Sequence, residues 1–258
     1  MITQQGAMDT QSKKDIYDQL QKEILLLQGI KPQPEGAATI KGLGPILSAF
    51  PNAVFPSAAI HEFIIDSREQ AAASGGFIAG LLAALMQHSG IAMWISVSRQ
   101  LFPSALKPFG LEPDRMIFAD LKREKEVLWT MEEALKCDGL NAVIAEVQQI
   151  SFKQSRRLQL AVEQSRVTGI ILRNQTEKLS ATASNARWKI SPLPTVPEQG
   201  MPGLGFPRWQ VELLKVRNGN PGSWQVEWAA DEFYTLPVQK QVSALHAEQR
   251  KTEQRKTG

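Results

Sequence analysis

The sequence has little of the chemistry that disulfides, metal sites and membrane spans require. Its 258 residues include one cysteine, Cys137, and three histidines, His61, His88 and His246, that are far apart in the chain. One cysteine cannot form an internal disulfide, and none of these residues has ligand spacing. We therefore expect no metal site and a buried, inert Cys137. The longest apolar run, residues 77–86, is about half as long as a membrane span, and no secretory leader is apparent, so we expect a cytoplasmic protein without membrane association.

The chain has almost no excess charge outside its C-terminal tail. It contains 29 Lys and Arg and 26 Asp and Glu, of which residues 240–258 hold five and two, which leaves 24 of each sign elsewhere. A short basic tail is more typical of a solvated end than of a nucleic-acid arm. We predict three parts: an N-terminal helix and linker at 1–49, a core with a C-terminal β hairpin at 50–238, and the basic tail at 239–258.

Short apolar runs alternate with helical patterns between residues 59 and 174. The runs predict strands at 59–65, 91–97, 114–121, 140–147 and 167–174, and the patterns predict helices at 77–88, 124–137 and 153–166. Strands this apolar, separated by helices, indicate an α/β fold with a mostly parallel central sheet and helices on both faces. Further strands are predicted at 186–190, 208–216 and 223–228. Because Asn-Gly and Pro-Gly mark a turn between the last two, they favour an antiparallel extension of the sheet.

The N-terminal segment carries one amphipathic pattern. Residues 15–28 predict a helix in which Ile16, Leu20, Ile24 and Leu27 form an apolar stripe. The stripe can dock on its own domain or on a second copy of the chain, and the sequence favours neither. These four residues are therefore candidates for self-association.

The segment after the first predicted strand lacks the parts of a phosphate-binding loop. Such a loop follows G-x-x-x-x-G-K-[ST], in which lysine and backbone amides hold phosphate and the hydroxyl holds magnesium. Aligned on Ser74 and Gly75, the lysine position falls on Gly76 and the hydroxyl position on Phe77, and no lysine occurs in residues 66–80. We interpret Arg68, Ser74, Gly75 and Gly76 as a vestigial loop before the helix at 77–88.

Several separated motifs carry a resemblance to a known family. They are "FPSAAIHEFI", "EQAAASGGFIAGLLAAL", "MWISVSRQLFP", "NAVIAEVQQIS", "GIILRNQ", "SATASNARWKI" and "PRWQVELLKVRNGNPGSWQVEW". Together they resemble the RecA-type ATPase core over residues 50–228, and in detail ImuA, a RecA/SulA-related family. ImuA is encoded with ImuB, an inactive Y-family polymerase homologue, and with an error-prone replicative-type polymerase. The resemblance implies a RecA-like fold.

The resemblance also places the active residues of a RecA-type ATPase on this chain. The catalytic glutamate falls on Ser98, which is no strong general base. The metal-site acid falls on Glu146, for which an exposed strand end is the simpler reading, and the phosphate-sensing residue falls on Gln175. Because phosphoryl transfer needs its parts together, we expect no enzymatic activity and no cofactor.

The function that the resemblance implies is a non-catalytic accessory role in SOS-induced translesion synthesis and mutagenesis. The implied partners are an ImuB-like polymerase homologue and the error-prone polymerase, with RecA, single-stranded DNA and a second copy as further candidates. Docking candidates are the Pro/Gly-rich loop 192–207 and the tail, and DNA-binding candidates are Lys153, Arg156, Arg157 and Arg166. The alternatives are a divergent DNA-stimulated ATPase that modulates recombinase filaments and a SulA-like inhibitor of cell division.

Overall fold

The computed structural model describes residues 40–86, 89–99, 101–174, 180–197 and 203–237, together with Ile16, Gln19 and Leu20. The chain divides into two units, Met1–Ala38 and Thr39–Gly258, and the described strands lie in the second. In the first unit, the three described residues are helical, and Ile16 and Leu20 are exposed. The other two residues of the predicted apolar stripe, Ile24 and Leu27, lie outside the described residues.

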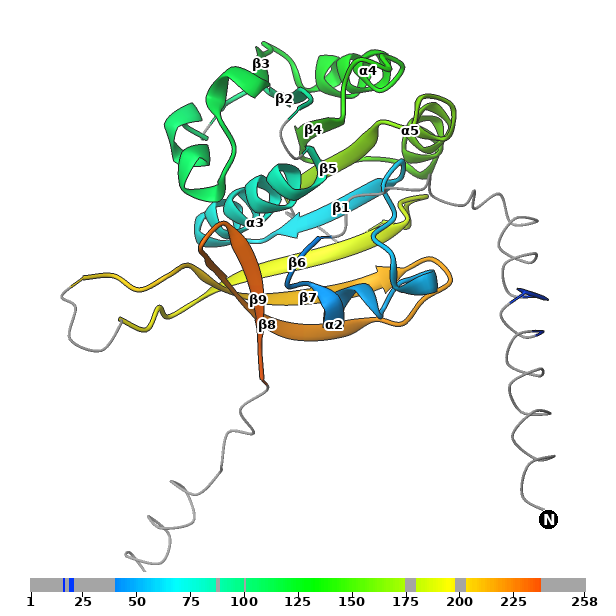
Figure 1. Cartoon of the computed structure of the whole chain (residues 1–258). Helices are drawn as coiled ribbons and strands as arrows, with labels where there is room; N and C mark the ends of the chain where they lie inside the picture. The colour runs from blue at the N-terminus through cyan, green and yellow to red at the C-terminus, as the bar shows by residue number, and fades with distance from the viewer. Residues whose placement is uncertain are drawn as a thin grey trace, which may run out of the picture. The chain divides into compact units, whose positions relative to one another are not determined.

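Nine strands of the second unit form one sheet in the order β3-β2-β4-β5-β1-β6-β7-β8-β9 (Figure 1). The strands from β3 to β6 in this order pair in parallel, and β7, β8 and β9 extend the sheet with antiparallel pairs. The bounds are β1 Ile60–Ile65, β2 Ala92–Ser96, β3 Met116–Asp120, β4 Ala142–Val147, β5 Thr168–Asn174, β6 Ala186–Leu193, β7 Arg208–Val216, β8 Gly222–Ala229 and β9 Glu232–Leu236. The predicted parallel sheet with an antiparallel extension is confirmed, and β9 was missed.

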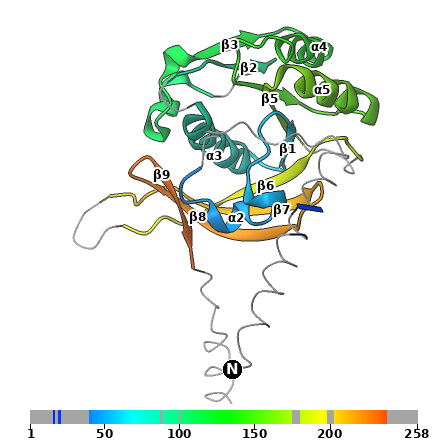
Figure 2. The ribbon, with the colours of Figure 1, turned by 45° about the vertical axis from the view of Figure 1, so that its right-hand side comes forward.

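Helices cover both faces of the parallel part of the sheet (Figure 2). Helix α3, Arg68–Met86, packs on one face, and α4, Glu124–Ala134, and α5, Phe152–Ser165, pack on the other. Because side chains alternate along a strand, Phe63 and Ile65 of β1 join the core under α3, whereas Ile60 joins the core under α4 and α5. The short helices α2, Gly44–Leu47, and η2, Pro103–Phe109, add Leu47 and Leu106 to the α3 side; the remaining 3-10 turns are η1, Pro51–Ala53, and η3, Pro113–Arg115.

Helix α3 is the central helix of the larger core. Among the described residues it is the one helix long and apolar enough to cross a membrane by length and composition. Of the apolar window that passes this test, 61% is buried inside the fold. Its apolar length is thus used for packing against the sheet.

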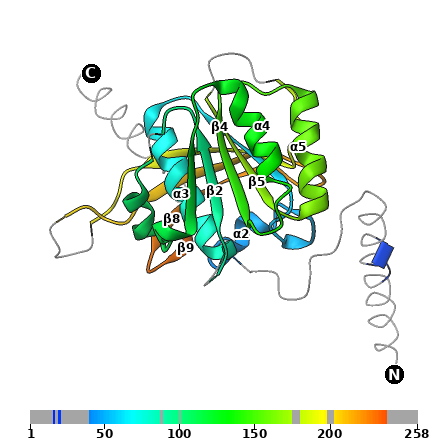
Figure 3. The same ribbon diagram turned by 90° about the horizontal axis from the view of Figure 1, so that it is seen from above.

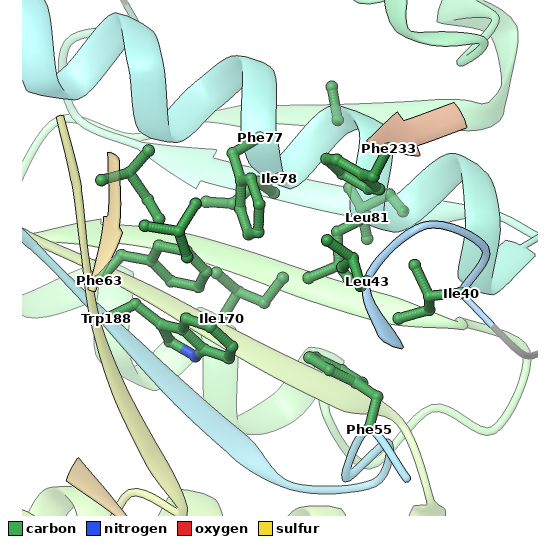
Figure 4. Close-up of a cluster of buried hydrophobic side chains, with 14 of the residues drawn as sticks. Ile40, Leu43, Phe55, Phe63, Phe77, Ile78, Leu81, Ile170, Trp188 and Phe233 are labelled. Atoms are coloured by element: carbon green, nitrogen blue, oxygen red, sulfur yellow. The ribbon is translucent and has the colours of Figure 1, made fainter. Parts of the chain in front are cut away.

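The larger core is built around Trp188 of β6 (Figure 4). The Trp188 ring stacks on Phe63 with 5.9 Å between centroids, and Phe77 of α3 lies 6.3 Å from Trp188. Ile40 and Leu43 are each 1% exposed and belong to the same core. The end of the predicted linker, residues 40–49, is therefore part of the folded unit, because its apolar residues bury despite the surrounding glycine and proline.

His61 is a fully buried histidine on the same side of β1. Its ring stacks on Phe55 at 4.5 Å between centroids and is held at both nitrogens. Trp188 donates its indole N–H to Nδ1 at 3.2 Å, and Nε2 lies 2.9 Å from the Pro56 carbonyl oxygen. Nε2 must therefore carry the proton that is donated to Pro56. Burial lowers the pKa of His61 to about 4, so the imidazole is neutral at neutral pH.

We expect His61 to make the stability of the protein fall in mild acid. A folded-state pKa of about 4 lies below the ordinary value near 6.5, so the stabilisation is present above pH 6.5 and is lost as the pH falls toward 4. The size of the effect is on the order of 3 kcal/mol. Urea unfolding between pH 7 and 4 measures it. His61→Gln should be less stable at pH 7 but should show a flatter pH dependence; an unchanged slope would contradict this assignment.

Candidate functional site

The segment expected to form a vestigial phosphate loop is helical. Helix α3 begins at Arg68, three residues after β1 ends at Ile65, and Ser74, Gly75 and Gly76 lie inside it. The loop prediction was therefore wrong. The glycines suggested a loop, but at Gly76 a Cβ atom would lie 2.8 Å from the Phe109 ring, so close packing between α3 and η2 accounts for that glycine.

The N-terminus of α3 uses the side chains beside it as caps. The Gln70 N–H donates to Ser67 Oγ at 3.3 Å, and the Asp66 N–H donates to Gln70 Oε1 at 2.9 Å. This reciprocal arrangement resembles a capping box, which satisfies amides that would otherwise be free for an anion. The site therefore has fewer donors for phosphate than an uncapped helix end would have.

Charge at this helix end is also unfavourable to phosphate. The exposed carboxylates of Asp66 and Glu69 flank the first turn of α3. Hydrogen bonds from the Ser67 hydroxyl and from its own backbone amide hold the pKa of Glu69 below its ordinary value, so this carboxyl group is ionised. The nearby Lys189 ammonium lies 2.6 Å from the Asp66 carboxylate and is paired with it. Arg68 is exposed.

The hydroxyl groups of Ser74 and Ser96 are buried on the same side of the sheet as α3. Ser74 is 0% exposed and Ser96 is 1% exposed, and neither hydroxyl has a hydrogen-bond partner among the described residues. Ser98, at the position of the catalytic glutamate, is exposed after β2, and Gln175 lies outside the described residues. The Ser74 hydroxyl points into protein and is not presented to a solvated magnesium ion.

The Glu146 side chain is hydrogen-bonded to an indole on the neighbouring strand. Trp94 of β2 donates its Nε1–H to Glu146 Oε1 at 2.6 Å, and burial raises the pKa of the carboxyl group. The reading of Glu146 as an exposed strand-end residue was therefore wrong, since its side chain is half-buried and bonded. In the part of the chain that the structure describes, no three His, Cys, Asp or Glu side chains are grouped to hold a metal ion.

The sequence did not predict a buried ionic network that lies on the face of β1 away from α3. Glu62 of β1 is 0% exposed and accepts hydrogen bonds at both oxygens. Arg173 Nη1 of β5 lies 3.0 Å from Oε1, and Arg187 Nε of β6 lies 2.8 Å from Oε2. The hydroxyl groups of Thr182 and Ser184 donate to Oε2, at 2.8 and 3.3 Å. One carboxylate thus links three neighbouring strands.

The same network fixes the segment 180–185 over the sheet. Arg173 Nη2 donates to Ser180 Oγ at 3.0 Å, and Arg187 Nη2 donates to the Ser180 carbonyl at 3.0 Å. Lys215 Nζ donates to the Thr182 carbonyl at 3.0 Å, and burial with nearby Arg187 lowers the pKa of Lys215. The sequence signal for this network is one acidic residue, Glu62, within a strand that is apolar apart from it and His61, "IHEFII".

Comparison with known proteins identifies the family. No family model matches the chain. The chain is 33% identical over 187 residues to Protein ImuA of Caulobacter vibrioides strain NA1000/CB15N. The matched region covers 68% of this chain and 77% of that protein. Protein ImuA of a second strain, ATCC 19089/CB 15, matches with the same identity and coverage. The chain belongs to the ImuA family. The family predicted from the sequence is confirmed.

This ImuA-family chain presents its candidate DNA-binding residues at the surface. Lys153, Arg156, Arg157 and Arg166 are all exposed on or beside α5. Arg157 is paired with Glu132 of α4 at 2.8 Å, whereas the other three form no ion pair among the described residues. Arg166 ends α5 as its C-cap in the left-handed conformation, with φ of 68°. Binding of DNA to this face of the ImuA-family chain stays a prediction.

Three further residues of this ImuA-family chain bear on the sequence predictions. Cys137 is exposed beyond the end of α4, so the prediction of a buried thiol was wrong. Self-association through Ile16 and Leu20 stays a prediction, although both side chains are about half exposed, at 54% and 51%. Their exposure leaves an apolar surface that a partner helix or a second copy can cover.

Proposed function

We propose that this ImuA-family chain is a non-catalytic, RecA-like accessory protein of DNA-damage-induced translesion synthesis and mutagenesis. It acts in the cytoplasm by binding an ImuB-like polymerase homologue and, through that partner, an error-prone DNA polymerase. The mostly parallel sheet with antiparallel C-terminal strands supports the RecA-like part of this proposal. Membership of the ImuA family supports the role in mutagenesis.

The junction between β1 and α3 carries the proposal that the protein is not an ATPase. Phosphate would require free amides and a cation there, but Ser67 and Gln70 cap the helix, and the Lys189 ammonium is paired with Asp66. On β4, the Glu146 carboxylate accepts the Trp94 N–H, and burial raises its pKa, so one of its oxygens is already engaged. A helix end that is capped and flanked by carboxylates does not favour a triphosphate, and it therefore does not favour magnesium-ATP.

The connection between β6 and β7 supports binding to a protein partner. Its two limbs extend away from the sheet (Figure 1), and a Cβ atom on Gly205 would lie 2.0 Å from the Val196 carbonyl, so the limbs run close together. Val196, Leu204 and Phe206 are 55%, 96% and 41% exposed on these limbs. Large apolar side chains exposed on a projecting element are typical of a protein contact.

Co-purification with the cognate ImuB-like protein tests the proposed function. We expect the full-length chain to retain this partner, and we expect Leu204→Asp to weaken the complex at least about tenfold, since one desolvated anchor can supply that much affinity. Deletion of residues 239–258 should also weaken it while the thermal unfolding transition stays unchanged. Phe102→Asp is the matched control, because Phe102 is 75% exposed elsewhere on the surface. Absence of any complex with the full-length chain would refute the proposed function.

A further inference from the structure

A hollow lies between α4 and α5 on the face of the sheet away from α3. The two helices lie side by side (Figure 3), and the hollow has a volume of about 150 Å³. From α4 it is lined by Lys125, Leu128, Trp129 and Glu132, whose spacing places them on one side of that helix. From α5 it is lined by Gln154, Arg157 and Leu158.

Trp129 is the most unusual residue of this hollow. Its side chain is 64% exposed, although tryptophan is a residue that proteins usually bury. In the described part of the chain it forms no ring–ring contact and donates no hydrogen bond. Beside it, Leu128 is half-buried and Leu158 is 2% exposed, so the floor of the hollow is aliphatic. An aromatic wall over an aliphatic floor is suited to one large apolar side chain.

The rim of the hollow is positively charged. Lys125 lines it from α4, and Lys153 lies one helical turn before Arg157 on α5. Glu132 neutralises Arg157 at 2.8 Å, but Lys125 and Lys153 form no ion pair among the described residues. The rim therefore has one uncompensated cation, Lys125, and a second, Lys153, lies one turn of α5 from the lining residue Arg157.

We infer that this groove binds an acidic peptide segment of a protein partner, with one large apolar side chain inserted against Trp129. Lys125 at the rim and Lys153 one turn of α5 away attract the acidic residues, and Gln154 supplies a polar contact at the rim. Single-stranded DNA fits less well. The Glu132 carboxylate stands within the hollow, and the hollow spans about two turns of α4, whereas a single strand needs a continuous row of cations and stacking platforms. The C-terminal tail of this chain is basic and does not complement the rim.

Selection from a random library of 12-residue peptides tests this inference with the full-length chain. We expect the peptides retained by the wild-type protein, and lost when Trp129→Ala is used, to share several Asp or Glu residues around one Leu, Phe or Trp. Retained peptides that do not depend on Trp129, or that share no acidic residues, would overturn the inference. The selection needs no ImuB-like protein, so its outcome is separate from that of the proposed function.

Affinity measurements on one selected peptide sharpen the test. Trp129→Ala should weaken binding at least about tenfold. The double variant Lys125→Glu/Lys153→Glu should weaken it by a similar factor at low salt and by less at high salt. The matched controls are Phe102→Ala, at an aromatic residue that is 75% exposed, and Lys107→Glu, at an exposed lysine of η2, and both should bind as the wild type does. A labelled thirty-nucleotide oligo(dT) is the competing ligand: if it depends on Trp129 and displaces the peptide at lower concentration, the groove is a DNA site and the inference is wrong.

Discussion

Replacing Glu62 by alanine is expected to lower the free energy of unfolding by about 3–5 kcal/mol, because it leaves buried arginine charge without its counterion. The Arg173 side chain is 6% exposed and Arg187 is 13% exposed, so water cannot replace the lost carboxylate well. Thr182 would also lose its acceptor. Guanidinium unfolding at pH 7 measures the effect. Segment 180–185 should become an early site of limited proteolysis, because the network holds it on the sheet.

An exposed ion pair supplies the control for Glu62. Glu232 lies 2.9 Å from Lys41, and the two side chains are 38% and 76% exposed. Solvent screens such a pair, so Glu232→Ala should cost less than about 1 kcal/mol. Glu62→Gln should fall between the two, since it keeps the shape and one acceptor oxygen. If Glu62→Ala were as stable as Glu232→Ala, the network would not be holding the three strands together.

Two glycines of α3 should respond to alanine in opposite directions. At Gly80 a Cβ atom would lie 2.7 Å from Trp228 and 2.9 Å from Phe233, and both rings are buried. Trp228 is fixed further by donating its indole N–H to the Pro108 carbonyl at 2.9 Å. We expect Gly80→Ala to destabilise the protein by about 1–3 kcal/mol, despite its better helix propensity.

The opposite result is expected at Gly75, where a Cβ atom would lie 3.8 Å from Leu101 in ordinary contact. Because Gly75 is inside a helix, Gly75→Ala should stabilise the protein by about 0.5–1 kcal/mol. The same substitution would be harmful if residues 74–76 formed a glycine-dependent loop. Chemical denaturation of both variants beside the wild type therefore tests the helical description of this segment as well as the packing of α3.

Most of the sheet could be predicted from local patterns. The apolar runs that became β1 to β5 and the turn between β7 and β8 are short-range signals, and they were placed within a few residues of the observed strands. Strand β9 was missed because its turn is formed by Ala230 and Asp231, with φ of 48° and 59°, and contains no glycine to mark it. The start of α3 was missed for the converse reason, since Gly75 and Gly76 suggested a loop but lie inside the helix; of the two, Gly76 is required by close packing against Phe109.

The candidate site was predictable only in part, because its contacts join distant residues. The alternation of strands and helices predicts that ligands bind at the carboxyl ends of the parallel strands. The sequence after the first strand shows directly that the lysine and the hydroxyl of a phosphate-binding loop are missing there. The two arginine partners of Glu62 are 111 and 125 residues away in the chain, so no local pattern reveals them. Glu146 was read as exposed because its bond to Trp94 joins residues 52 positions apart.

Release of phosphate from magnesium-ATP is the most direct measurement of whether this chain acts by binding and not by catalysis. The full-length protein is incubated with and without single-stranded DNA, and Glu146→Gln is measured beside the wild type. We predict no phosphate release above that of buffer under either condition, and the same result for the variant. Release that DNA stimulates and that Glu146→Gln abolishes would contradict the account, since it would require a working nucleotide site at the junction of β1 and α3.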